Sequence, residues 1–277
     1  MTIIVDGRRI GYEETSGAGT PLVLLHGFPL DRTIWDEQVP ALAGRRVVRI
    51  DLRGSGESEP SDGPALMEAL AGDVAGVLDA LGIERAAFAG HSIGGYVALA
   101  FFRMYAERVA GLALIASHVD PDASTLPNAS GAQRALAAGR DDLANRLERE
   151  GTMDAAIESY LPRYFAPHVY AERPDLVARV RAIMARQDPR GCAQLVRGMK
   201  VRLDGNELLE DVHVPALVVA GAQDTYLAPE TLEKVAAAMN RATFVCLERV
   251  GHLPQMEAPE ETARALTTFA AQVSASA

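Results

Sequence analysis

Short apolar runs alternate with helix-like segments along this chain, and this alternation limits the fold more than any other feature. The runs PLVLL, AAFA, LALIA and ALVVAG are apolar throughout, and VVRI is apolar except for Arg49. Stretches with helical periodicity, such as residues 65–82 and 259–273, stand between and after these runs. A strand that is apolar on both faces needs cover on both faces, which a parallel sheet between two helix layers supplies. The pattern therefore predicts an α/β fold with a mostly parallel sheet.

Two segments depart from this alternation. At the start, the runs TIIV and RIGYEET flank Asp6-Gly7, which is a hairpin signal and predicts an antiparallel edge. Residues 119–204 contain only helix-like stretches, without a strand signal between them. We therefore predict a core of residues 1–118 and 205–277, with residues 119–204 as an inserted helical cap over the sheet.

A candidate nucleophile lies in the sequence Gly90-His91-Ser92-Ile93-Gly94, which has the form G-x-S-x-G. The motif follows a predicted strand and opens a predicted helix, which is the context it requires. Such a serine sits on a sharp turn with its hydroxyl exposed, and the glycines avoid collisions with the neighbouring strand and helix. The alternative is a serine that only caps or packs the helix.

A serine hydroxyl needs a base to become nucleophilic. In this chain order we expect the base to be His252, in RVGHLPQMEAP, after the last predicted strand. The acid that orients the imidazole is predicted to be Asp224, which directly follows the apolar run ALVVAG. Asp120, which follows the earlier run LALIA, is the alternative acid.

An oxyanion that forms during attack needs two backbone N–H donors. One is predicted to be Ile93, the residue after the nucleophile, at the start of a helix. The other is predicted to be Phe28, in the loop HGFPLD after the run LVLL. Gly27 allows that loop to turn close to the site.

In order and spacing, five blocks of this sequence resemble the α/β-hydrolase superfamily: LLHGFPLDRTIWDEQVPAL, VVRIDLRGSGES, FAGHSIGGYVALAFF, PALVVAGAQD and GHLPQMEAPEE. The resemblance implies an eight-stranded sheet, a helical cap over the catalytic edge, and Ser–Asp–His chemistry without a cofactor. HGFPLD followed by a tryptophan resembles small bacterial esterases and cofactor-free perhydrolases, also called non-haem haloperoxidases. VRGMKVRLD before VPALVVAG resembles 3-oxoadipate enol-lactonase-like enzymes. Epoxide hydrolases and haloalkane dehalogenases use an aspartate nucleophile, and Ser92 argues against both.

The predicted function is that of a serine hydrolase that cleaves a small carboxylic ester or lactone through an acyl-enzyme on Ser92. Perhydrolysis and amide hydrolysis are alternatives with the same triad, and a non-catalytic small-molecule receptor or regulator is an alternative on the same fold. We expect substrate contacts from aromatic and apolar residues beside the site, and an apolar lining would favour a neutral substrate. The predicted contacts are Trp35, Tyr160, Tyr164, Tyr226 and Leu253.

Composition excludes several other classes. The formal net charge of −10 over 277 residues argues against nucleic acid as a partner. No apolar run approaches the roughly 20 residues that span a bilayer, and the N-terminus lacks a signal-peptide pattern, so we expect a cytoplasmic protein. Cys192 and Cys246 lack metal or redox spacing, so no metal is expected. The predicted partner is a small-molecule substrate, and no oligomeric state is predicted.

Overall fold

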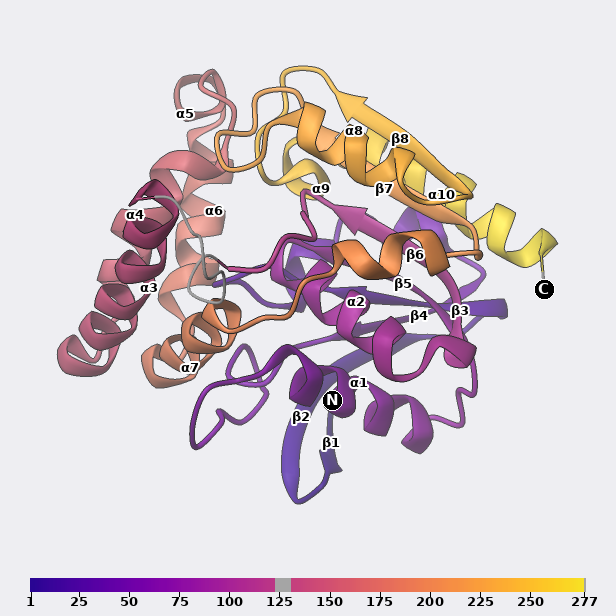
Figure 1. The fold of residues 1–277 in the computed structure, drawn as a ribbon, viewed down its shortest axis with the longest axis horizontal. Helices are drawn as coiled ribbons and strands as arrows, with labels where there is room; N and C mark the ends of the chain where they lie inside the picture. The colour runs from indigo at the N-terminus through magenta and orange to yellow at the C-terminus, as the bar shows by residue number, and fades with distance from the viewer. Residues whose placement is uncertain (123–130, 277) are drawn as a thin grey trace.

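One mixed sheet organises the molecule (Figure 1). The structure is a computed structural model, and it describes residues 1–122 and 131–276. Within them, eight strands pair in the order β1-β2-β4-β3-β5-β6-β7-β8. The strands are β1 (Thr2–Val5), β2 (Arg8–Thr15), β3 (Ala18–Leu25), β4 (Arg45–Ile50), β5 (Ala86–His91), β6 (Val109–Ile115), β7 (Ala216–Gly221) and β8 (Ala242–Leu247). All neighbours from β4 to β8 are parallel, which confirms the predicted mostly parallel sheet.

The antiparallel edge comes from the N-terminal hairpin. Asp6 and Gly7 both have positive φ, 46° and 76°, as a two-residue turn that matches the strand twist requires. The turn sets Val5 opposite Arg8, and β2 then pairs antiparallel with β4. The expected edge hairpin is therefore present, and it leaves the parallel strands in the middle of the sheet.

Helices cover both faces of the sheet. The helix α2 (Ile93–Met104) packs beside Leu114, because a Cβ on Gly95 would lie 3.3 Å from that side chain. The helix α10 (Pro259–Ala275) packs on Gly111, where a Cβ would meet its Val273 at 2.4 Å. Side chains three positions apart on a strand point to opposite faces, so α2 and α10 lie on opposite sides. The remaining core helices are α1 (Met67–Ala80), α8 (Pro229–Ala237), α9 (Pro254–Glu257) and the 3₁₀ helices η1 (Arg32–Trp35), η2 (Pro40–Leu42), η3 (Ala106–Arg108) and η5 (Asn206–Asp211).

Helices also make up the described part of the segment between β6 and β7. Figure 1 shows them grouped beside the core. They are α3 (Gly131–Glu150), α4 (Asp154–Tyr164), α5 (Val169–Glu172), α6 (Pro174–Ala185) and α7 (Pro189–Lys200). No strand interrupts residues 131–200, and residues 123–130 of the predicted cap lie outside the described residues. Below, "the cap" means residues 131–200.

A buried carboxylate joins the cap to the loop after β3. Asp31, whose side chain is 4% exposed, accepts two hydrogen bonds of 2.8 Å from the guanidinium of Arg186. It also accepts one of 2.9 Å from Gln187 Nε2. Burial disfavours its charged form, but the Thr33 hydroxyl and Arg186 outweigh burial and hold the pKa of Asp31 below its usual range. The cap is thus tied to the loop that carries Phe28.

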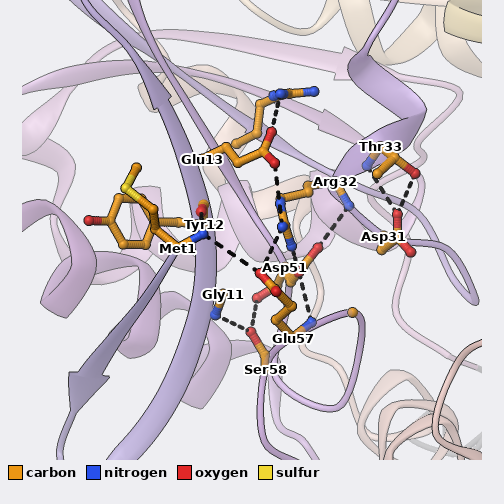
Figure 2. Close-up of polar contacts among 12 residues, drawn as sticks. Met1, Gly11, Tyr12, Glu13, Asp31, Arg32, Thr33, Asp51, Glu57 and Ser58 are labelled. Carbon is orange, nitrogen blue, oxygen red and sulfur yellow. Dashed lines mark hydrogen bonds and ion pairs between the residues drawn. The ribbon is translucent and has the colours of Figure 1, made fainter.

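A second buried carboxylate ties that loop to the sheet. Figure 2 shows Asp51, at the end of β4, among the residues it binds. Its carboxylate accepts hydrogen bonds of 2.9 Å from the backbone N–H groups of Arg32 and Glu57, and it pairs with the Arg32 guanidinium. Ser58 Oγ donates to the Asp51 carbonyl at 2.6 Å. The loops after β3 and β4 are therefore held against each other.

Candidate active site

Ser92 lies on a strained turn at the carboxyl edge of the sheet. It follows β5 directly and precedes α2, with φ 51° and ψ −116°. This conformation is costly for a residue with a Cβ, and such strain concentrates at functional sites. Its N–H donates to Ile115 O at 3.0 Å, which holds the turn against the end of β6. The strand–turn–helix context of the G-x-S-x-G motif is present.

The glycines of the motif stand where the backbone approaches closely. A Cβ on Gly90 would lie 2.3 Å from the carbonyl carbon of Gly94, at the start of α2. A Cβ on Gly94 would lie 2.4 Å from Leu25 O, at the end of β3. Both distances are far below any tolerated contact, so the turn requires glycine on each side of Ser92.

Asp224 and His252 are brought together by the ends of β7 and β8. Asp224 Oδ2 lies 2.7 Å from His252 Nδ1, and both side chains are almost fully buried. Asp224 Oδ1 accepts from the N–H groups of Tyr226 and Leu227 at 2.7 and 3.1 Å. Burial disfavours the charged form, but His252 and the two N–H groups outweigh burial and lower the pKa of Asp224. An ionised carboxylate only accepts, so Nδ1 carries the proton of this hydrogen bond.

The alternative acid, Asp120, occupies a different place. Its side chain is 58% exposed and lies 3.7 Å from His118 Nδ1. Its Oδ1 accepts a hydrogen bond of 3.0 Å from Asn206 Nδ2. The structure therefore gives His252 a carboxylate partner in Asp224 and places Asp120 beside other groups.

Two hydrogen bonds hold the backbone of His252, and one ring contact holds its imidazole. His91 Nε2 donates to His252 O at 2.7 Å, and burial together with the charge of His252 lowers the pKa of His91 to about 3, so this ring stays neutral. The His252 N–H donates to Tyr164 O at 2.8 Å. The Tyr164 ring stacks on the imidazole, with centroids 5.9 Å apart and planes 15° apart, and its hydroxyl donates to Phe28 O. The cap residue Tyr164 thus connects the histidine loop to the loop after β3.

Glu257, which the sequence analysis did not single out, clamps the same loop. Its carboxylate accepts from Gly251 N–H at 3.0 Å and from Leu253 N–H at 3.1 Å, on either side of His252. It also accepts from Ala166 N–H, in the cap, at 2.8 Å. Burial raises the pKa of Glu257 although these N–H groups favour the charged form. The only sequence signal was its place in the block GHLPQMEAPEE.

The two predicted oxyanion donors lie on adjacent loops. β3 and β5 pair in parallel with Leu25 beside Gly90, so the loop with Phe28 lies next to the turn with Ser92. Ile93 is the first residue of α2, where backbone N–H groups point out of the helix. Neither N–H donates to an acceptor within the described part of the chain. This placement suits an oxyanion site, and the assignment stays a prediction.

A cavity of about 400 Å³ contains Ser92 and His252. This volume suits a small organic molecule. Aromatic side chains from core and cap line much of it: Phe28, Tyr96, Tyr160, Tyr164 and Tyr226. Three of the predicted substrate contacts, Tyr160, Tyr164 and Tyr226, are among these lining residues.

The other two predicted contacts do not line the cavity, and their prediction was wrong. Trp35 is fully buried in η1, which packs against β3, β4 and α9. Leu253 is fully buried as well, directly after His252 at the start of α9. Both side chains pack in the hydrophobic core. Proximity in sequence to a site residue does not fix the direction in which a side chain points.

The model of the alpha/beta hydrolase family matches residues 22–265. This chain belongs to the alpha/beta hydrolase family. The eight-stranded mostly parallel sheet with helices on both faces is the fold of that family, as the resemblance implied.

Solved structures and curated proteins resemble this hydrolase over most of its length. A thermophilic esterase from Thermogutta terrifontis, solved with malate bound, is 36% identical with a TM-score of 0.90, and the match covers 99% of this chain and 97% of that one. The enol-lactonase from Burkholderia xenovorans LB400 is 28% identical with a TM-score of 0.86, covering 97% and 99%. The dihydrolipoyllysine-residue acetyltransferase component of an acetoin cleaving system from Pseudomonas putida is 32% identical, covering 96% of this chain and 67% of that protein.

Charged residues also line the cavity of this hydrolase, and sequence reasoning missed them. Arg140 of α3 and Arg163 of α4 are both lining residues. His118, after β6, lines the cavity as well, but burial lowers the pKa of its imidazole and favours the neutral ring. No sequence signal separates these arginines from others on the cap, because helical periodicity does not show which face a helix turns toward a site.

The described residues include neither a candidate metal-binding cluster nor a helix that could cross a membrane. They contain no group of three or more His, Cys, Asp or Glu side chains that could hold a metal ion. None of their helices has the length and hydropathy needed to cross a membrane.

Proposed function

We propose that this hydrolase cleaves a carboxylic ester or lactone through an acyl-enzyme on Ser92. The observation that carries the proposal is the 2.7 Å Asp224–His252 pair at the cavity that also contains Ser92. A serine on a strained turn, an imidazole with an unprotonated Nε2 and a buried carboxylate behind it are the parts of nucleophilic acyl transfer.

The reaction would proceed in two halves. His252 Nε2 takes the proton of Ser92 Oγ as that oxygen attacks the carbonyl carbon, and Asp224 stabilises the imidazolium. The N–H groups of Phe28 and Ile93 donate to the oxyanion. Collapse breaks the ester bond, and His252 returns its proton to the leaving alcohol. Water then attacks the acyl-serine with His252 again as base, which releases the acid and restores Ser92.

Two of the similar solved structures support the choice of substrate class. One is an esterase and one an enol-lactonase, and both match more than nine-tenths of this chain. Hydrogen peroxide in place of water would give a peracid, and an amide would use the same residues. A receptor on this fold would bind its ligand with little turnover, so the rate of turnover separates that alternative from an enzyme.

The test is a panel of p-nitrophenyl esters of increasing acyl length and small lactones, with fluorophosphonate labelling of Ser92. We expect saturable turnover of at least one class and stoichiometric labelling. One similar protein, from Pseudomonas putida, is an acetyltransferase component, so a thiol is also tested as the acyl acceptor. Product analysis with and without a small dithiol shows whether the acyl group passes to water or to a thiol. Absence of turnover across the panel, together with an unlabelled Ser92, would overturn the proposal.

Replacement of Glu257 by Gln should misplace the catalytic imidazole. A carboxylate accepts from three backbone N–H groups here, whereas the amide presents N–H donors to some of the same groups. A displacement of about 1 Å at a catalytic group costs roughly 10²-fold, so we expect kcat to fall at least about tenfold with little change in KM. The measurement is the pH profile of kcat together with the rate of fluorophosphonate labelling.

The matched control for this variant is Glu260→Gln. Glu260 lies three residues further along, and its side chain is 88% exposed. It should keep the wild-type kcat and labelling rate. A Glu257→Gln enzyme that unfolds at a lower temperature but labels at the wild-type rate would show that Glu257 stabilises the fold without positioning His252.

A further inference from the structure

The cavity carries positive charge in an otherwise acidic protein. Its described lining residues include Arg140 and Arg163 and no aspartate or glutamate, although the whole chain has a formal net charge of −10. Arginine side chains that face a cavity bind carboxylate and phosphate groups well, because the guanidinium presents several N–H donors in one plane. The lining is therefore not the apolar one that would favour a neutral substrate.

Arg140 is held in place by a buried carboxylate. Its side chain is only 14% exposed, and its Nε donates to Asp122 Oδ2 at 2.7 Å. The Asp122 carboxylate is 1% exposed and also contacts Arg202 Nη1 at 3.3 Å. Asp122 thus contacts two guanidinium groups, those of Arg140 and Arg202. A fixed and partly desolvated guanidinium favours an anion more than a mobile surface arginine does.

The remaining donors of Arg140 are available to a ligand. Nη1 lies 3.8 Å from Met199 Sδ, which is a weak acceptor, and Nη2 has no acceptor among the described residues. Tyr96 and Tyr160 line the same cavity, and neither phenol hydroxyl donates to a described residue. Burial raises the pKa of Tyr160, so its hydroxyl stays a donor. A guanidinium and two phenols make a donor set suited to a carboxylate.

Arg163 is less suited to hold an anion. It is exposed, its guanidinium lies 4.1 Å from the Tyr226 ring centroid, and Nη2 donates to Thr225 O at 3.3 Å. A solvated arginine at this position attracts anions toward the cavity but contributes little to fixing them.

We infer that the substrate is bifunctional, with its ester or lactone carbonyl at Ser92 and a carboxylate bound by Arg140. This inference rests on the proposed function and names its substrate class. Ser92 belongs to the core and Arg140 to the cap helix α3, and both line one cavity of about 400 Å³. A small molecule that carries both groups would bridge core and cap.

The test compares charged esters with neutral partners of matched length. The p-nitrophenyl half-esters of succinate, glutarate and adipate are paired with p-nitrophenyl butyrate, valerate and hexanoate, which places the carboxylate in the acyl part. Acetoxybenzoate and its methyl ester place it in the alcohol part. Hydrogen bonds to charged groups are worth about tenfold or more in affinity. For at least one pair we therefore expect kcat/KM about tenfold higher for the charged ester.

The variant that tests the residue is Arg140→Met, and Arg149→Met is its control on the same helix. Arg149 is 66% exposed and contacts Glu150. Arg140→Met should bring the charged-to-neutral ratio of kcat/KM close to one, Arg149→Met should keep the wild-type ratio, and Arg140→Lys should keep part of it. A Tm measurement identifies any variant that fails to fold.

The outcomes separate this inference from the proposed function. If the wild-type enzyme hydrolyses neutral esters but its charged-to-neutral ratio of kcat/KM is near one for every pair, the inference is overturned and the esterase proposal stands. This measurement uses only the wild-type enzyme. A wild-type ratio that survives in folded Arg140→Met would also overturn it. Absence of turnover for all esters, with no labelling of Ser92, would overturn the proposed function itself.

Discussion

Replacement of Ser92 by alanine should reduce ester turnover by at least about 10⁴-fold, because removal of a triad nucleophile leaves only binding and oxyanion stabilisation. The fold should remain intact. Alanine keeps the Cβ, so the strain at φ 51° does not change, and no hydrogen bond from Ser92 Oγ to a described residue is lost. The measurements are steady-state kinetics, fluorophosphonate labelling and Tm.

Ser159→Ala is the matched control. Ser159 also lines the cavity, but its hydroxyl donates to Ala155 O at 2.8 Å within its own helix. This variant should label fully and keep turnover within about threefold of wild type. Retention of turnover or labelling by Ser92→Ala would exclude Ser92 as the nucleophile and leave the packing role that the sequence allowed.

Replacement of Asp224 by asparagine should cost about 10⁴-fold in kcat. Asp224 Oδ1 accepts from the N–H groups of Tyr226 and Leu227, so we expect the amide oxygen of the asparagine to take the place of Oδ1. The amide nitrogen then faces His252 Nδ1 and donates to it. The proton moves to Nε2, and the imidazole can then not take the Ser92 proton during attack. Steady-state kinetics with Tm as a folding control measure the effect.

Asp120→Asn separates the two candidate acids. Asp120 is more than half exposed and binds Asn206, so its replacement should change kcat by less than about threefold. A large loss of kcat in Asp120→Asn with a small loss in Asp224→Asn would instead identify Asp120, after β6, as the acid that orients the imidazole.

The sheet and the edge location of the candidate site followed from local patterns. Continuous apolar runs have only one stable use, as strands covered on both faces, and the Asp6-Gly7 turn requires the positive φ values that were found. Parallel strands end at the same edge, so the turn after β5 and the loops after β7 and β8 lie together there. The placement of Ser92, Asp224 and His252 could therefore be anticipated from chain order.

The cavity lining could not be anticipated in the same way. Trp35 and Leu253 stand next to site loops in sequence, but burial of large apolar side chains directs both into the core. Glu257 clamps the histidine loop through backbone N–H groups, which carry no sequence signature. Arg140 is one of several arginines on the cap, and only the structure shows that it contacts the buried Asp122 carboxylate and lines the cavity.

What the sequence alone determined is the layered sheet and the chain positions of the candidate site residues, because a strand–turn–helix with flanking glycines and a fixed chain order are local properties. What only the tertiary structure decided is the shape and charge of the cavity. Which face of α3 turns inward depends on how the cap packs on the core, and that packing sums many contacts between residues distant in sequence. The presence of Arg140 in the same cavity as Ser92 is a consequence of that packing, and so is the substrate class that we infer.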